Sequence, residues 1–163
     1  MNFEHFKFLI ANAFKQGAEG DGALPAKYDS IPVERLNPLV LAYVGDAYFA
    51  LYVRTRLLAY EQNKVRVLHS FDAKMVSAVM QAYAYRSIEP ILSDEELSVV
   101  RRGRNAKVNV PKSATIAEYR CSTGFEALLG YLYLGEKFDR LSEIAENAFV
   151  VISREMTNTA KKI

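Results

Sequence analysis

Two acidic side chains lie in stretches of sequence that are otherwise apolar or small. Asp46 is the only acid in residues 35–60, and Glu126 is the only acid in residues 119–135. A carboxylate in such surroundings costs free energy unless a cation, a hydrogen-bond donor or a metal ion compensates it. An aspartate in an apolar helix can also serve only to bond a buried hydroxyl or a lysine, so the environment of each acid decides its role.

Small residues flank both acids at helical spacing. The positions one helical turn away from them include Ala42, Ala50, Ser122 and Gly130. Small residues let two helices approach closely, so the two carboxylates converge if these faces meet. Two uncompensated carboxylates at short distance repel, unless one is protonated or a cation lies between them. A hard divalent cation with oxygen ligands and waters, such as magnesium, suits this pair.

The elements that must position these acids are predicted to be helices, and the expected fold class is all-α, a helical bundle. The expected helices cover residues 2–15, 38–58, 63–87, 93–103, 115–134 and 136–156. Two Ser/Thr-x-x-Glu patterns predict capping boxes, at Ser93 and at Thr115. Pro38 is tolerated in a first helical turn, and Gly135 is typical of a helix end.

Apolar periodicity predicts which helix faces are buried. In the helix expected over residues 63–87, the predicted buried stripe is Leu68, Phe71, Met75, Val79 and Ala82. Lys74 and Gln81, seven positions apart, are predicted to lie on a different, polar face. In the helix that carries Asp46, the apolar residues at spacings of three and four are Val40, Val44, Ala47 and Leu51.

The composition is typical of a globular protein with one main domain. The chain has 163 residues, of which half are hydrophobic, and a net charge of only +2. Three glycines and a proline in residues 17–25 indicate a linker, so we expect an N-terminal extension over residues 1–31, a main domain over 32–156 and a frayed tail over 157–163. The single cysteine, Cys121, favours a reducing, cytoplasmic compartment, and we expect neither a signal peptide nor a membrane span.

One stretch is strongly basic. Residues 101–112 contain five basic side chains and no acid, and Gly103 and Pro111 predict a loop there. Such a segment can neutralise phosphates of a nucleic acid, although a basic loop is more often only a solvated surface. The candidate RNA-binding residues are Arg101, Arg102, Arg104, Asn105, Lys107 and Lys112, with His69 and Lys74 as a possible extension of the patch.

Two motifs resemble one known family. The run YVGDAY at residues 43–48 resembles the signature helix of the ribonuclease III family, and FEALLGYLYL at residues 125–134 resembles its second acidic helix. They lie about eighty positions apart, with RRGRN at residues 101–105 between them. The chain ends soon after, so the resemblance over residues 32–156 is closest to the Mini-ribonuclease III group, which has the catalytic domain without a double-stranded-RNA-binding domain.

The resemblance implies a function. It implies magnesium-dependent endonucleolytic hydrolysis of double-stranded RNA, with Asp46 and Glu126 holding the metal and manganese as a substitute. It further implies a symmetric homodimer, for which Leu39 and Tyr43 are candidate contacts. The implied substrate is a helix in precursor large-subunit ribosomal RNA, which would make the protein part of ribosome biogenesis.

The sequence also departs from the family pattern. Full-length ribonuclease III enzymes carry acids at the positions of Ala42 and Thr123, so only two of four usual acidic positions are acidic here. Mini-ribonuclease III resembles this reduced set. The alternative is a catalytically inactive dimeric RNA-binding scaffold of the same fold, and a more distant one is a helical protein-interaction module. The sequence leaves open whether Glu118 joins the site or only caps its helix.

Overall fold

The structure is a computed structural model that describes residues 3–19, 32–107 and 114–161. The chain divides into two compact units, Met1–Pro32 and Val33–Ile163. In the first unit, α1 (Phe3–Glu19) is the helix expected near the N-terminus, and its apolar side chains Phe3, Phe6 and Ile10 are exposed.

The second unit is a bundle of helices. Its elements are η1 (Val33–Arg35), α2 (Pro38–Leu57), α3 (Val65–Met75), α4 (Ala78–Ile88), η2 (Glu89–Ile91), α5 (Asp94–Arg104), α6 (Ile116–Leu134) and α7 (Phe138–Ala160). All regular elements in the described part of the chain are helical, which confirms the predicted all-α class. Among these helices none combines the length and the apolarity needed to cross a membrane.

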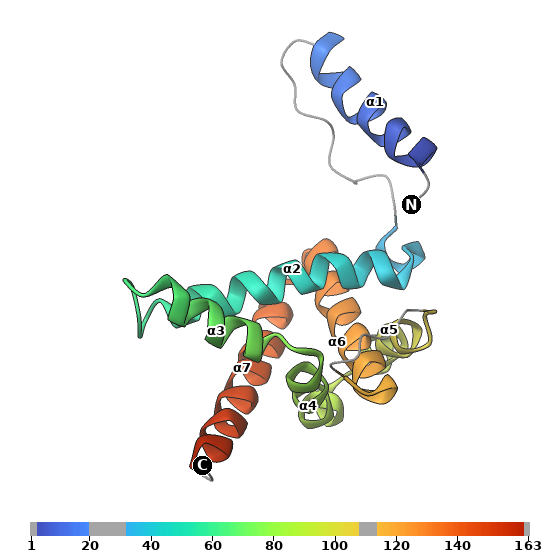
Figure 1. Cartoon of the computed structure of the whole chain (residues 1–163). Coiled ribbons are helices and arrows are strands. Elements are labelled where there is room, and N and C mark those ends of the chain that lie inside the picture. Colours follow the sequence, from blue (N-terminus) through green and yellow to red (C-terminus); the bar gives the residue numbers. More distant parts are fainter. Residues whose placement is uncertain (1–2, 20–31, 108–113, 162–163) are drawn as a thin grey trace. The chain divides into compact units, whose positions relative to one another are not determined.

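Helix α6 forms the centre of this unit. It packs against α2, α4, α5 and α7 (Figure 1). Almost all of its side chains between Cys121 and Leu134 are buried, because other helices surround α6. A helix in this position must be apolar on every face. Phe125 of α6 meets Phe49 of α2 edge to face, with ring centroids 5.2 Å apart.

Two glycines let α2 and α6 touch through their backbones. A Cβ atom at Gly45 would lie 1.8 Å from the carbonyl oxygen of Glu126, and a Cβ atom at Gly130 would lie 1.9 Å from the carbonyl oxygen of Leu41. Only a residue without a side chain fits at either position. The close approach expected from small residues is therefore confirmed, and it occurs beside Asp46 and Glu126.

The helix predicted over residues 63–87 is wrong, because the structure has two helices there. The backbone leaves the helical path at Val76, and Ser77 caps α4: its hydroxyl accepts from the backbone N–H of Met80 and donates to the carbonyl of Lys74 at 2.8 Å. The break rotates α4 relative to the expected stripe. As a result Val79 on α4, predicted to be buried, is exposed, whereas Gln81, predicted on a polar face, is fully buried. Phe71, also predicted to be buried, is exposed on α3, which precedes the break.

The other helix boundaries follow the sequence with two exceptions. Both capping boxes, Ser93 with Glu96 and Thr115 with Glu118, are present. The first exception is that α1 continues to Glu19, beyond the expected end at residue 15. The second is that α7 continues to Ala160, where a frayed tail was expected from residue 157, because no glycine or proline interrupts the helix there.

Candidate active site

Asp46 and Glu126 are brought together by the crossing of α2 and α6. Gly45, directly before Asp46, lies against the backbone of Glu126. The negative charge of Asp46 acts on the carboxyl group of Glu126, which places the two side chains in the same local environment. The convergence that the sequence suggested is therefore present, and it is set by the backbone contact of the two helices.

The two carboxyl groups have different electrostatic states. Burial, and next the charge of Asp46, raise the pKa of Glu126 to about 8. Asp46 is more exposed, and partial burial raises the pKa of its carboxyl while the Arg54 guanidinium opposes this rise. Near neutral pH and without a cation, the Glu126 carboxyl therefore mostly keeps its proton.

This pair fits a divalent cation that takes oxygen ligands. A mostly buried glutamate that loses its proton only near pH 8 is compensated when a positive charge binds between it and its neighbour. No cluster of three or more His, Cys, Asp or Glu side chains forms a metal site in residues 3–19, 32–107 and 114–161. Two carboxylates suffice for magnesium, which commonly binds one or two of them and completes its shell with waters and substrate phosphates.

The two positions at which the resemblance implies further acids in longer relatives, Ala42 and Thr123, are buried here. Ala42 is 5 % exposed and lies in the core, and Thr123 is 4 % exposed. The Thr123 hydroxyl donates to the backbone carbonyl of Tyr119 at 2.9 Å, so it is used within its own helix. Neither residue offers a ligand to the pair.

Glu118 caps α6. Its carboxylate accepts from the backbone N–H of Thr115 at 2.9 Å and from the Thr115 hydroxyl at 2.6 Å. These hydrogen bonds hold the pKa of Glu118 below its ordinary value. Of the two roles left open by the sequence, the structure supports the cap.

Gln81 is the polar residue at this site that the sequence did not reveal. Its side chain is fully buried, and neither amide atom has a hydrogen-bond partner of standard geometry. It nevertheless acts on Glu126 as a hydrogen-bonding neighbour that lowers the pKa of that carboxyl. Leaving a buried amide unpaired costs about 1–3 kcal/mol. A signal existed in the sequence: once α4 begins at Ser77, Gln81 falls in line with the buried Ala84, Tyr85 and Ile88.

The basic residues around position 101 lie mainly on a helix, so the prediction of a loop there is wrong for Arg101–Arg104. Arg101 is exposed on the last turn of α5, and Asn105 is the C-cap residue of that helix. Arg102 donates to the backbone carbonyls of Glu34 at 2.8 Å and Leu36 at 2.6 Å, so its guanidinium holds the segment before α2.

The remaining basic candidates are spread over several elements. The Arg104 guanidinium lies over the ring of Tyr85, 5.8 Å from its centroid. Lys107 is exposed just after α5, and Lys112 lies outside the described residues. His69 and Lys74 are exposed on α3, which packs against α2, α4 and α7, whereas α5 packs against α2 and α6.

Both candidate dimer contacts are on the surface of α2. Tyr43 is 79 % exposed and Leu39 is 36 % exposed. Val40 and Leu51 are also exposed, and with Tyr43 and Ala47 they form an apolar stripe along this helix, which we call the α2 stripe. A row of exposed apolar side chains on one helix is typical of an interaction surface.

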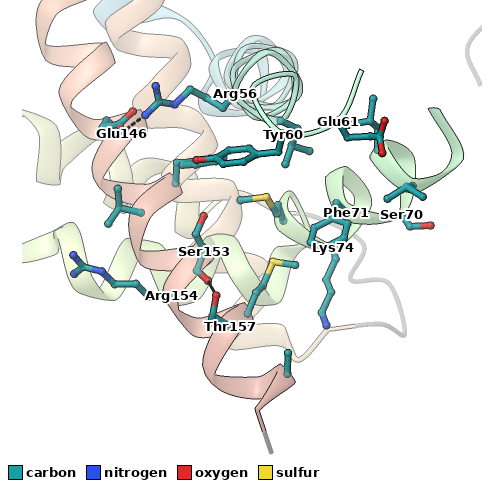
Figure 2. Close-up of a pocket in the computed structure, with 18 residues that line it drawn as sticks. Arg56, Tyr60, Glu61, Ser70, Phe71, Lys74, Glu146, Ser153, Arg154 and Thr157 are labelled. Carbon is teal, nitrogen blue, oxygen red and sulfur yellow. Dashed lines mark hydrogen bonds and ion pairs between the residues drawn. The ribbon is translucent and has the colours of Figure 1, made fainter. Parts of the chain in front are cut away.

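A groove of about 970 Å³ lies away from the carboxylate pair. It is formed by the C-terminal end of α2 together with α3 and α7, and neither Asp46 nor Glu126 lines it. Figure 2 shows Tyr60, Phe71 and Lys74 around this groove and the ion pair between Arg56 and Glu146. Its walls are mainly apolar, and its two acids have other partners: Glu146 pairs with Arg56, and Glu61 accepts from backbone N–H groups of its own loop.

Comparisons with known proteins agree with this geometry. A family profile described as Ribonuclease III domain matches residues 39–137. The chain is 49 % identical over 118 residues to a Mini-ribonuclease 3 of Thermoanaerobacter sp. (strain X514), covering 72 % of this chain and 83 % of the relative. A Mini-ribonuclease 3 of Staphylococcus aureus is 36 % identical over 124 residues, which cover 74 % of this chain and 92 % of the relative.

A solved structure has the same arrangement. The X-ray crystal structure of a protein from Fusobacterium nucleatum superposes with a TM-score of 0.67 and 30 % sequence identity. The match covers 76 % of this chain and 97 % of the Fusobacterium chain. The fold of the second unit is therefore one that an experimental structure also displays.

Proposed function

The chain belongs to the ribonuclease III family and is an endoribonuclease, and from this premise we propose that it cuts double-stranded RNA with magnesium held by Asp46 and Glu126. The observation that carries the proposal is the convergence of two carboxyl groups, one of which has a pKa of about 8 because of burial and the other's charge. We take residues 32–156 as the catalytic domain.

The two acids have distinct roles in this proposal. Asp46, the more exposed and more readily ionised, supplies the first negative charge, and Glu126 gives up its proton when the cation binds. When bound, the metal offsets negative charge at the reacting phosphate and lowers the pKa of the attacking water. Manganese is expected to substitute because it accepts the same oxygen ligands.

The exposed cations near the end of α5 are proposed to bind the RNA backbone. The cations Arg101 and Lys107 are exposed there beside the neutral, polar Asn105, which we include as a hydrogen-bonding residue, and we extend the proposed set to Arg104 and, beyond the described residues, to Lys112. A-form RNA is recognised mainly through phosphates and 2′-hydroxyl groups, with little reading of sequence. Arg102 is engaged with backbone carbonyls and is assigned to the fold, while His69 and Lys74 on α3 form at most a separate contact.

A symmetric homodimer is part of the proposal. The α2 stripe, with Tyr43 79 % exposed, offers an apolar surface that a second copy could cover through the same residues. Each protomer would then contribute one Asp46–Glu126 pair, and each pair would cut one strand of the duplex.

The proposed substrate is a helix in precursor large-subunit ribosomal RNA, processed in the cytoplasm during ribosome biogenesis. The support is the similarity to proteins named Mini-ribonuclease 3. Incubating the protein with precursor and mature ribosomal RNA tests it: cutting confined to the precursor supports this substrate, and indiscriminate cutting of both contradicts it.

The activity is tested by cleavage of a long RNA duplex at low salt, with and without magnesium. Asp46→Asn and Glu126→Gln are each expected to slow cutting by at least about 100-fold, because even residues that only support metal ligands contribute 10- to 100-fold. Both variants should still bind the duplex. Cutting that continues in EDTA, or in both variants, would contradict the proposed metal site.

The alternative weighed from the sequence, a scaffold without catalysis, rests only on the non-acidic residues Ala42 and Thr123 and conflicts with membership of a family of endoribonucleases. This alternative predicts that the parent protein binds the duplex and never cuts it. Under this alternative the RNA also stays intact when manganese is supplied. It stays intact as well when structured ribosomal precursors replace the plain duplex.

A further inference from the structure

We propose that Gln81 is a positioning residue for Glu126: its buried side-chain amide holds the Glu126 carboxylate in the orientation that receives the divalent cation. This role presupposes the proposed metal site and adds a residue that belongs to neither of the two acidic helices. It concerns the binding of the metal, not contact with the RNA.

The placement of Gln81 is the first argument. Gln81 stands on α4, which packs directly against α6, the helix that carries Glu126. The other residues on its side of α4, Ala84, Tyr85 and Ile88, are all buried hydrophobic side chains. A buried amide is unusual at a position whose neighbours are all hydrophobic, because a leucine or methionine would fill the same space without a polar group to satisfy.

The hydrogen bonding of Gln81 is the second argument. Gln81 is 0 % exposed, and both its Nε2 and its Oε1 are buried without a protein partner of standard geometry. Buried polar groups in native proteins are almost always paired, and an exception calls for an explanation. The neighbour on which this amide acts is the carboxyl group of Glu126. We therefore assign that carboxyl group, at the proposed metal site, as the partner that completes the hydrogen bonding of Gln81.

The chemistry of an amide fits this task better than the alternatives. The Nε2 group can donate to one carboxylate oxygen and leave the other free for a cation. A lysine or arginine there would form an ion pair with Glu126 and repel the metal, and an acid would add a third negative charge. An apolar residue would leave the ionised carboxylate without a donor. Groups that orient metal ligands from behind in this way typically contribute about 10- to 100-fold to metal affinity or activity.

The decisive measurement is metal binding by the protein alone. Mn²⁺ affinity is measured by electron paramagnetic resonance for the parent, Gln81→Met and Gln81→Asn, in the absence of RNA. Methionine keeps the length of the side chain and removes the donor, and asparagine keeps the amide but withdraws it by one methylene group. Both are expected to weaken Mn²⁺ binding by about 10- to 100-fold. An affinity within about twofold of the parent in both variants overturns the proposal.

Two further readouts separate positioning from a merely structural role. The magnesium concentration that half-saturates cleavage should rise in Gln81→Met while cutting recovers at high magnesium. The melting temperature of Gln81→Met in EDTA should stay level or rise, because methionine fills the same buried space and has no polar group to satisfy. A lower melting temperature with unchanged metal affinity would assign Gln81 to the core alone and overturn the proposal.

A matched control comes from α6. Ser122 is 2 % exposed, and its hydroxyl donates to the carbonyl of Tyr119 within the same helix. Ser122→Ala therefore removes a buried polar group near the site without removing a donor to Glu126, and its Mn²⁺ affinity should equal that of the parent. If the parent itself neither binds Mn²⁺ nor cuts RNA, the proposed function fails; if the parent does both and the Gln81 variants match it, only the positioning role fails.

Discussion

Glu126 is the residue whose chemistry depends most on its surroundings. Burial and the adjacent charge of Asp46 move its pKa from 4.5 to about 8. A cation that binds to the ionised carboxylate must displace this proton, so metal affinity is expected to rise with pH up to about 8 and then level off. The acid that the proposed reaction uses is thus protonated in the resting protein near neutral pH.

The same pKa predicts how stability depends on pH. Between about pH 5 and 8 the folded protein keeps a proton on Glu126 that the unfolded chain has lost, so the free energy of unfolding should fall as pH rises through this window and level off above it. Glu126→Gln stays neutral, and its profile should lack this fall. Urea denaturation in EDTA from pH 5 to 9 checks this.

The comparison between parent and variant is the control for other titrating groups. Asp46 also has a raised pKa and remains in both proteins, so its contribution appears in both profiles. At pH 9 the Glu126→Gln protein should be the more stable of the two, since it buries no charge at that position. Parallel profiles for the two proteins would show that Glu126 titrates near its ordinary pKa.

At the scale of the elements, the crossing of α2 and α6 determines the site. The missing side chains of Gly45 and Gly130 allow backbone contact, and the acids adjacent to that contact have little freedom to move apart. The site is therefore built on two rigid helices and not on loops. This arrangement keeps two mutually repelling carboxyl groups together before any cation arrives.

A methyl group at position 45 should separate the helices. Gly45→Ala places a Cβ atom 1.8 Å from the carbonyl oxygen of Glu126, and backbone atoms cannot yield as a flexible side chain can. We expect a loss of about 3 kcal/mol or more in the free energy of unfolding, together with weaker metal binding. Denaturant titration and Mn²⁺ binding measure the two effects.

The neighbouring Ala47 provides the comparison. It is exposed on the same helix, and Ala47→Gly should cost only about 1 kcal/mol, the difference in helix propensity. If Gly45→Ala lowers the free energy of unfolding by no more than this control, α2 and α6 can accommodate a methyl group between them, and the predicted steric clash is wrong.

The elements also show what the sequence could predict. The starts of α2, α5 and α6 were readable because Pro38, Ser93 and Thr115 are strong local signals. Ser77 gives no such signal, because it lies in a run of apolar residues that continues the helical pattern, and without this cap the sequence does not indicate that Gln81 is buried.

Glycine has two structural roles here, ending a helix and allowing close helix packing, and the local sequence does not distinguish them. Gly135 ends α6 as expected, but Gly103 lies inside α5, where a Cβ atom would be 2.9 Å from the Cα of Gly124. Gly103 therefore serves packing between α5 and α6 and does not stop the helix. The acids Asp46 and Glu126 could be singled out from the sequence because each is isolated among apolar residues, whereas their convergence depends on tertiary contacts.

At the scale of the whole molecule, the α2 stripe raises the question of assembly. If a second copy covers it, introducing a charge at Tyr43, which is 79 % exposed, should separate the protomers. Tyr43→Glu is expected to yield a monomer by light scattering at micromolar concentration, because two carboxylates would face each other across a two-fold axis. Tyr60→Glu changes a tyrosine that is 82 % exposed outside the stripe and should leave the assembly intact. A Tyr43→Glu protein with the mass of the parent would remove the α2 stripe from the interface.

The electrostatics of the whole surface predict weak RNA binding with strong salt dependence. A net charge of +2 gives little general attraction, so the local cations must supply most of it. Arg101→Ala and Lys107→Ala should each weaken duplex binding and reduce the slope of log affinity against log salt by about 1. Arg154→Ala, on the exposed side of α7, is the control and should leave the slope unchanged. Equal slopes for all three variants would exclude the end of α5 from the RNA contact.

The contact between Gly45 and Gly130 also has a genetic consequence. Any missense change at either codon introduces a Cβ atom, so every substitution at these two positions creates a collision with the opposing backbone. Asp46 and Glu126 are under no such steric constraint, and a lineage that ceased to need the reaction could exchange them freely while keeping the fold. Descendants of this fold that have lost catalysis should therefore lose their acids and retain both glycines. A homologue that keeps both acids but has a larger residue at either glycine position would need a shift of α2 away from α6 to make room for the added side chain.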